Sequence, residues 1–241
     1  MRETSIALVT GANRGIGYAI AEGLVKHGLT VVLAARDPSA GPAAAARLGA
    51  RPLVLDVTDP ASVRAAAAQV DDWYGRLDVL VNNAGIAGRR DAQTPGAVDL
   101  DAVREVFETN LFGVIQVTEA FLPLLRRSGD ARIVNVSSGT GSLAWMTDEQ
   151  HRFAVRRTSA GYPVSKSALN MLTVQYAKAL AGERIKVNAI APGACDTDFA
   201  RGLGLRLERT AEQGAAAAIE LATMADAPTG HFRDDAGTVP W

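Results

Sequence analysis

A tyrosine and a lysine in this chain have the spacing of an acid–base pair. Tyr162 and Lys166 lie four residues apart in the run Tyr-Pro-Val-Ser-Lys, and residues four apart on a helix share one face. Pro163 is tolerated only in a first helical turn, so the run predicts a helix that begins here. A phenol has a pKa of about 10, and an adjacent ammonium group lowers this pKa toward the neutral range. The same pair also occurs on ordinary helix surfaces, so alone it leaves a structural role open.

A serine at the end of a buried strand could act on the same substrate. The apolar run Arg132–Val136 is followed by Ser137 and Ser138. A hydroxyl at this place can orient a carbonyl oxygen and stabilise the negative charge that develops on it. The alternative is a polar strand end that satisfies nearby backbone groups. With the tyrosine and the lysine, Ser138 makes acid–base chemistry on a carbonyl compound the first hypothesis.

A glycine-rich turn, Thr10–Gly17, directly follows the first apolar run. Its first glycine allows a tight turn, its second lets the backbone approach a pyrophosphate, and its third permits close packing of helix on strand. The helix that follows presents free N–H groups and its positive dipole end to phosphates. No Gly-Lys-Ser/Thr follows the turn, so it is not a P-loop, and a turn without a ligand is the alternative. The candidate cofactor contacts in this segment are Gly11, Asn13, Arg14, Gly15, Ile16 and Gly17.

An arginine near the end of the second apolar run indicates the kind of dinucleotide. NAD-binding sheets usually carry an acid there for the ribose hydroxyls, but this chain has Ala35 followed by Arg36. A guanidinium can grip a 2′-phosphate with two hydrogen bonds, and Arg14 could approach the same phosphate. Asp37, the next residue, is acidic and argues against a bound 2′-phosphate. The alternative is that both arginines are solvated surface residues. The pattern predicts NADP(H).

Six short apolar runs alternate with longer helical stretches, which predicts a parallel sheet with helices on both faces and one domain over residues 1–241. The expected strands are Ile6–Val9, Thr30–Ala35, Pro52–Leu55, Leu77–Val81, Arg132–Val136 and Ile185–Ile190. The expected helices are Gly15–His27, Ala43–Leu48, Ala61–Trp73, Asp101–Arg127 and Tyr162–Ala181. Two irregular segments, 139–161 and 195–209, follow strand ends, where open α/β sheets bind ligands, and we expect them to form the walls of a substrate pocket.

The composition excludes several classes of protein. The 241 residues are 48% hydrophobic and 21% charged, and a net charge of −1 leaves no basic excess for nucleic acid. Cys195 is the one cysteine, which rules out an internal disulfide and suits a reducing compartment. No apolar run approaches the ~20 residues that span a bilayer, no signal peptide is recognisable, and the histidines lack metal-ligand spacing. We expect a cytoplasmic protein with no metal, membrane or nucleic acid partner.

Together these motifs resemble the short-chain dehydrogenase/reductase family over nearly the whole chain. The resemblance implies a Rossmann-type doubly wound sheet in which Ser138 positions the substrate, Tyr162 is the general acid in reduction, and Lys166 lowers the pKa of Tyr162 and binds the ribose. It also implies that Asn110 holds a water leading to the catalytic lysine. Further cofactor contacts implied by the resemblance are Asp56 and Val57 at the adenine, Asn83, Ala84 and Gly85 in an Asn-Asn-Ala-Gly element, and Pro192, Gly193 and Thr197 at the nicotinamide amide.

The resulting hypothesis is NADPH-dependent reduction of a ketone or aldehyde, in which Tyr162 donates the proton to the carbonyl oxygen. An alcohol dehydrogenase working in the oxidative direction is one alternative, and a non-catalytic NADP(H)-sensing protein is another. All four catalytic positions are filled, which favours an enzyme. The partner would be a small carbonyl or alcohol compound that the sequence does not identify.

Within the family, the chain is most similar to the carbonyl reductase and menthone-type reductase branch. Ser138 and Tyr162 are 24 residues apart, wider than the family's usual dozen or so, which indicates an insert before the helix. The family's usual Val-Asp-Gly-Gly ending is absent. We expect the insert to fold over the helices at 110–127 and 162–181 and to cover the apolar surface a second subunit would need. This favours a monomer and leaves a homo-oligomer open.

Overall fold

The structure of the chain is a computed structural model that describes residues 4–151, 153 and 158–241. Within these residues one eight-stranded sheet has the order β3-β2-β1-β4-β5-β6-β7-β8, parallel throughout except between β7 and β8. The strand order reverses at the β1–β4 pair, which is the kind of switch point where open α/β sheets bind ligands. The strands are β1 (Ile6–Thr10), β2 (Thr30–Ala35), β3 (Arg51–Val54), β4 (Val79–Asn82), β5 (Ala131–Val136), β6 (Ile185–Ile190), β7 (Phe232–Asp234) and β8 (Gly237–Thr238).

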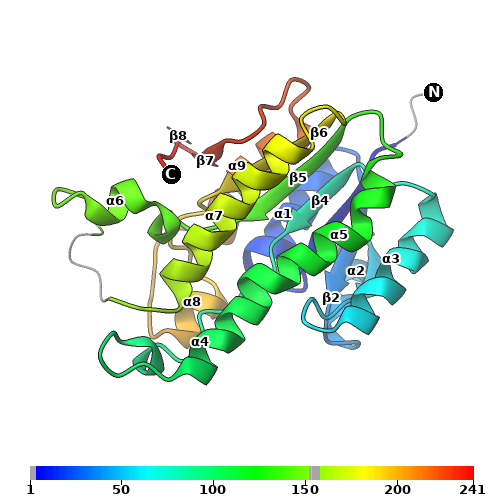
Figure 1. The fold of residues 1–241 in the computed structure, drawn as a ribbon. Coiled ribbons are helices and arrows are strands. Elements are labelled where there is room, and N and C mark those ends of the chain that lie inside the picture. The colour runs from blue at the N-terminus through cyan, green and yellow to red at the C-terminus, as the bar shows by residue number, and fades with distance from the viewer. Residues whose placement is uncertain (1–3, 152, 154–157) are drawn as a thin grey trace.

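Helices cover both faces of the sheet, with α3, α5 and α7 in front of the strands in Figure 1 and α1 and α9 behind them. This arrangement confirms the expected doubly wound α/β fold. The α-helices of the described residues are α1 (Gly15–Lys26), α2 (Ala40–Leu48), α3 (Pro60–Tyr74), α4 (Leu100–Phe107), α5 (Gly113–Leu125), α6 (Leu143–Thr147), α7 (Tyr162–Ala179), α8 (Asp198–Gly202) and α9 (Ala211–Thr223).

Side-chain alternation along β1 explains why both faces must be covered. Ile6 and Leu8 point into the core beneath α3 and α5, whereas Ala7 and Val9 point into the core beneath α1 and α9. All four are at most 6% exposed. A strand that is buried on both faces is apolar at every position, which is why the sequence shows a continuous apolar run there.

Several elements differ from the expectation. The helix expected over 101–127 is divided by a π-helical turn, Glu108–Phe112, in which the Gly113 N–H donates to the Glu108 carbonyl. Two strands, β7 and β8, were not predicted, because segments of three and two residues have no measurable periodicity. The helix α9 was not among the expected helices either, although it contains four consecutive alanines at 215–218.

The 139–161 segment packs against the C-terminal residues. The Ser142 hydroxyl donates to the Pro240 carbonyl at 2.6 Å, and the Ala144 N–H donates to the Trp241 carbonyl at 3.2 Å. Trp145 packs on the small core cluster that contains Phe232. Residues 142–145 are therefore anchored beside β7 and β8.

The apolar surface on the α5–α7 side stays open as a result. Phe112, Val164 and Met171 are between 46% and 59% exposed. The expectation that the insert covers this surface is wrong for the described residues, because Ser142 and Ala144 are held against Pro240 and Trp241 instead. The expected monomer stays a prediction, and it has lost this support.

We expect the core beneath α5 to be sensitive to loss of volume. Phe121→Ala should lower the free energy of unfolding by about 3–5 kcal/mol, because the ring is fully buried and leaves a cavity. Phe112→Ala removes the same ring from an exposed position and should change stability by about 0.5 kcal/mol or less. Urea denaturation of both variants measures this, and equal losses would contradict the placement of the two rings.

Candidate functional site

A cleft of about 1380 Å³ runs along the carboxyl ends of the parallel strands. Its lining comes from the turns after β1, β4, β5 and β6, and from residues around α6 and α8. All the candidate residues named from the sequence line this cleft, except Asn110. The structure therefore brings together residues that lie up to about 190 positions apart in the chain.

The turn between β1 and α1 has the backbone conformation that its glycines predict. Gly11 and Gly15 have φ of +62° and +59°, in the left-handed region where glycine has no steric penalty. A Cβ on Gly17 would lie 2.3 Å from Asn83 Nδ2 and 2.7 Å from the Gly11 carbonyl oxygen, so α1 approaches the turn this closely only with glycine there. Arg14, the N-cap residue of α1, makes no side-chain capping bond. The first-turn N–H groups can therefore face an anion.

Asn83 joins this turn to the end of β4. Its Nδ2 donates to the Thr10 carbonyl at 2.8 Å and to the Gly11 carbonyl at 3.1 Å. In return the Thr10 hydroxyl accepts from the N–H groups of Asn83 and Ala84, each at 3.0 Å. The two strand ends on either side of the switch point are thus locked together, which makes the turn rigid.

Arg36 is exposed and lines the cleft just beyond the end of β2. The neighbouring Asp37 is engaged with the backbone, since its Oδ1 accepts from the N–H groups of Ser39 at 2.8 Å and Ala40 at 3.1 Å. These hydrogen bonds, led by that of Ser39, hold the pKa of Asp37 below its usual value. The Asp37 carboxylate, which the sequence analysis counted against a 2′-phosphate, therefore binds the backbone at the start of α2.

Arg14 is paired with an acidic side chain across the cleft lining. Its Nη1 lies 3.1 Å from Asp198 Oδ2, and both side chains are about half exposed or more. An exposed ion pair of this kind contributes about 0–1 kcal/mol. Such a weak contact can be exchanged for a bound phosphate.

The two serines after β5 have different roles in the structure. Ser137 is buried, and its Oγ donates to Asn170 Oδ1 at 2.6 Å and lies 3.3 Å from the Lys166 carbonyl, so it ties the strand end to α7. Ser138 is partly exposed to the cleft, and its Oγ accepts from the Thr140 N–H at 3.2 Å and contacts the Thr140 hydroxyl at 2.9 Å. The hydroxyl of Ser138 is therefore the one that a molecule in the cleft can reach.

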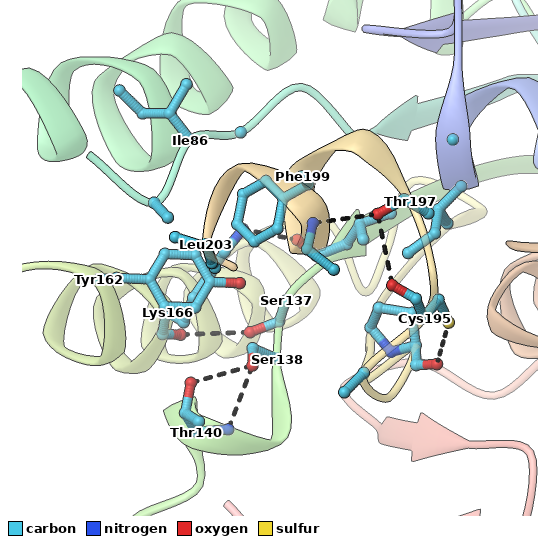
Figure 2. Close-up of a pocket in the computed structure, with 18 of the residues that line it drawn as sticks. Ile86, Ser137, Ser138, Thr140, Tyr162, Lys166, Cys195, Thr197, Phe199 and Leu203 are labelled. Carbon is cyan, nitrogen blue, oxygen red and sulfur yellow. Dashed lines mark hydrogen bonds between the residues drawn. The ribbon is translucent and has the colours of Figure 1, made fainter. Parts of the chain in front are cut away.

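Tyr162 and Lys166 project from the first two turns of α7 toward this strand end (Figure 2). Lys166 Nζ lies 5.8 Å from the centroid of the Tyr162 ring. The same ammonium group donates to the Val136 carbonyl at 2.8 Å. The side chains of Ser138, Tyr162 and Lys166 thus meet at one wall of the cleft, as the sequence predicted.

Burial dominates the electrostatics of Lys166. The side chain lies in the protein interior, and the residue is 4% exposed. Desolvation lowers the pKa of its ammonium group from 10.5 to about 8. A lysine with this pKa is mostly charged at neutral pH, so it can stabilise a nearby phenolate there.

Asn110 lies behind the cleft, in the π-helical turn between α4 and α5. Its Nδ2 donates to the Ile86 carbonyl and to Ser165 Oγ, each at 3.0 Å, and its Oδ1 accepts from the Ile86 N–H at 2.9 Å. A Cβ on Gly85 would lie 3.2 Å from Asn110 Oδ1 and 3.5 Å from Lys166 Nζ. Asn110 therefore clamps the loop after β4 beside the lysine, and its expected role in holding a water stays a prediction.

The remaining predicted contacts line the cleft in the turns after β3 and β6. Asp56 Oδ1 accepts from the N–H and the hydroxyl of Thr58 at 2.9 Å and 2.7 Å, which orders the first of these turns. Thr197 is the N-cap residue of α8, where its hydroxyl accepts from the Ala200 N–H at 3.5 Å. Val57, Pro192 and Gly193 complete this set.

Both irregular segments contribute aromatic side chains to the lining of the cleft. Trp145 stacks on His151 with ring centroids 4.8 Å apart, and Phe153 meets both rings edge-on. The Phe199 ring lies 5.8 Å from that of Tyr162 (Figure 2). The two segments expected as pocket walls do line the cleft, although residues 152 and 154–157 lie outside the described part of the chain.

Sequence reasoning missed two residues that the structure places at this site. Thr140 contacts the Ser138 hydroxyl, and Gln93 reaches the backbone of Tyr162 from the loop before α4. Neither belongs to a recognisable motif. Their importance arises from contacts made by the fold.

Over residues 4–151, 153 and 158–241, no cluster of three or more His, Cys, Asp and Glu side chains is arranged to hold a metal ion. In the same part of the chain, no helix combines the length and apolar character needed to cross a bilayer.

Proteins of known name share this architecture. A model of the short chain dehydrogenase family matches residues 5–208. The chain is 39% identical to the short-chain dehydrogenase anuI of Penicillium roqueforti (strain FM164), over 90% of this chain and 88% of that protein. It is 36% identical to carbonyl reductase (NADPH) 3 of Rattus norvegicus, over 98% of each. The solved structure of salutaridine reductase from Papaver somniferum superposes with a TM-score of 0.81 at 29% identity, over 95% of this chain and 99% of that one.

We expect the buried lysine to make stability depend on pH. Between the folded pKa of about 8 and the ordinary value of 10.5, the unfolded chain holds a proton that the folded chain has lost, so the free energy of unfolding rises with pH. The rise over this window is roughly 3 kcal/mol. Lys166→Met removes this titration, so the stability of the wild type relative to this variant should increase by that amount between pH 8 and 10.5.

Urea denaturation at several pH values measures the difference. Lys178→Met, the same change at an exposed position of α7, should give a curve parallel to that of the wild type. Parallel curves for the wild type and Lys166→Met would show that burial does not lower the pKa of Lys166.

Proposed function

The chain belongs to the short-chain dehydrogenase family, and on this premise we propose that it is an NADPH-dependent reductase of a ketone or an aldehyde. One observation carries the proposal. The Ser138 hydroxyl, the Tyr162 phenol and the buried Lys166 ammonium group are presented to a single cleft by the end of β5 and the start of α7. The name of the Rattus norvegicus relative, carbonyl reductase (NADPH) 3, supports both the substrate class and the cofactor.

The glycine turn suits a dinucleotide. Gly11, Gly15 and Gly17 keep the space at the N-terminus of α1 free of side chains, and the open first-turn N–H groups would bind its phosphates. Lys166 and Tyr162 would reach the ribose and nicotinamide end. When bound, the nicotinamide supplies a hydride to the carbonyl carbon of the substrate.

The side chains around the cleft supply the proton and stabilise charge. Ser138 Oγ donates a hydrogen bond to the carbonyl oxygen, on which negative charge develops during reduction. Tyr162 transfers its phenol proton to the same oxygen, which becomes the hydroxyl of the product. Lys166 stabilises the phenolate that remains, and its buried position strengthens this attraction relative to water.

The arginines at the adenosine end support NADPH over NADH. Arg36 is exposed on the cleft wall and has no acidic partner in the described part of the chain, and its neighbour Asp37 accepts hydrogen bonds from backbone N–H groups. Arg14 is held by one exposed ion pair that a phosphate can replace. A 2′-phosphate would be bound between these two guanidinium groups.

The aromatic walls favour a carbonyl compound with an apolar body. Trp145, Phe153 and Phe199 line the cleft, and Phe199 lies beside Tyr162. Apolar surface brought against these rings is removed from water. Oxidation of an alcohol would use the same side chains in reverse. The name of the Rattus norvegicus relative, a carbonyl reductase, supports the reducing direction.

Cofactor choice is the first test. We expect kcat/KM to favour NADPH over NADH by at least about tenfold, roughly 1.4 kcal/mol, which is the scale of one charge-assisted contact. Arg36→Ala should reduce this ratio mainly through the KM for NADPH. Arg64→Ala, at an exposed position of α3 outside the cleft, should leave the ratio unchanged. Equal use of both cofactors by the wild type would reject the assignment of Arg36 and Arg14.

Proton transfer is the second test. Tyr162→Phe keeps the ring and removes the proton donor, so turnover of ketones and aldehydes should fall by roughly 10²–10⁴. NADPH binding, followed by fluorescence titration, should change little. Tyr176→Phe is the matched control, because Tyr176 lies on the same helix and its hydroxyl contacts Glu119 outside the cleft. Near-normal turnover of Tyr162→Phe would reject Tyr162 as the acid.

A further inference from the structure

A glutamine side chain is buried beside the first turn of α7. Gln93 is fully buried, although it comes from a short helical turn, Asp91–Gln93, in an irregular part of the chain. Its Oε1 accepts from the Tyr162 N–H and from the Ser159 hydroxyl, each at 2.9 Å. Its Nε2 donates to the Ala87 carbonyl at 2.8 Å. The amide orientation follows from these partners, because a backbone N–H can only donate and a backbone carbonyl can only accept.

The backbone of the same residue makes a fourth contact. The Gln93 carbonyl accepts from the Ala160 N–H at 2.8 Å. One residue therefore connects three segments: the loop after β4 that lines the cleft, the exit of the 139–161 segment, and the start of α7.

The first turn of α7 has no cap within its own sequence. Its N-cap residue is Gly161, which has no side chain, and Pro163 has no N–H to donate. The Gln93 amide oxygen takes the place of a side-chain cap at Tyr162, from 69 residues away in sequence. The helix start that carries Tyr162 thus depends on a distant residue for its hydrogen bonding.

Two glycines make room for this side chain. A Cβ on Gly161 would lie 2.2 Å from Gln93 Oε1, and a Cβ on Gly88 would lie 2.8 Å from Gln93 Nε2. The amide therefore fills a slot that larger neighbours would close. This fit restricts the position of the helix start more tightly than one hydrogen bond alone.

We propose that Gln93 is a positioning residue for the reaction, which fixes the first turn of α7, and with it the Tyr162 phenol, relative to the cleft loop at Ala87. The inference rests on the proposed function, since it concerns the acid in carbonyl reduction. Gln93 acts through the backbone of Tyr162 and requires no contact with substrate. Small displacements of a reacting group are costly, since about 1 Å can reduce a rate about 10²-fold.

The main test replaces the amide by an apolar side chain of similar length. In Gln93→Met, kcat for ketone reduction should fall about 10–100-fold, while the dissociation constant for NADPH changes less than about threefold. Amide hydrogen exchange in the peptide covering residues 158–166 should become faster. Gln69→Met, the same change at an exposed position of α3, should alter none of these quantities.

A second variant separates positioning from general stability. In Gln93→Glu, the protonated carboxyl group can still accept from the Tyr162 N–H and donate to the Ala87 carbonyl, whereas the ionised group cannot donate. The kcat of this variant relative to the wild type should therefore be highest at low pH and fall as pH rises through the pKa of the new carboxyl group. Loss of stability alone would lower the folded fraction in step with the melting temperature, and kcat per folded molecule would then not change with pH relative to the wild type.

The outcomes are distinct. Wild-type kcat and unchanged exchange in a folded Gln93→Met would overturn the proposal, and so would a pH-independent ratio for Gln93→Glu. If the wild type itself reduces no carbonyl compound, the proposed function fails. In that case the exchange of residues 158–166 still decides whether Gln93 holds the start of α7.

Discussion

The parallel register of the central strands determines where every group of the cleft lies. In the β1–β4 and β4–β5 pairs, Val81 is opposite both Val9 and Val134, and in the β5–β6 pair Val136 is opposite Ile190. Because these strands run in one direction, their carboxyl ends meet at one edge, and the turns that leave this edge carry the candidate side chains. A shift of one residue in β5 would exchange the surroundings of Ser137 and Ser138, so the chemistry depends on this register.

Buried polar side chains hold the same register and join the sheet to its helices. Asn82 Nδ2 donates to Asn135 Oδ1 at 2.9 Å and to Thr118 Oγ1 at 3.2 Å, and Asn135 Nδ2 donates to Thr173 Oγ1 at 2.9 Å. The chain of bonds runs from α5 through β4 and β5 to α7. Each of these groups would cost about 1–3 kcal/mol if it were buried without a partner, so the network favours the single packing in which all of them meet. The helix that carries Tyr162 is one end of that network.

The sequence by itself determined the features that depend on local chemistry. Continuous apolar runs identify β1 and β2 because both faces of a central strand are buried, and positive φ at Gly11 and Gly15 explains the glycine turn. Pro163 located the start of α7 correctly, because proline is compatible only with a first turn. Arg36 was likewise recognisable from its place after a strand.

Tertiary structure alone decided the features that depend on contacts between distant segments. No local pattern distinguishes Gln93 from a surface glutamine, because its role comes from an N–H 69 residues away. The same holds for Asn110, which binds the backbone of Ile86 from a π-helical turn, and for Ser142 and Ala144, which donate to the carbonyls of Pro240 and Trp241. Periodicity reports which face of an element is buried, but it does not say which distant group that face contacts. In this protein, contacts of that kind place Tyr162 beside the cleft.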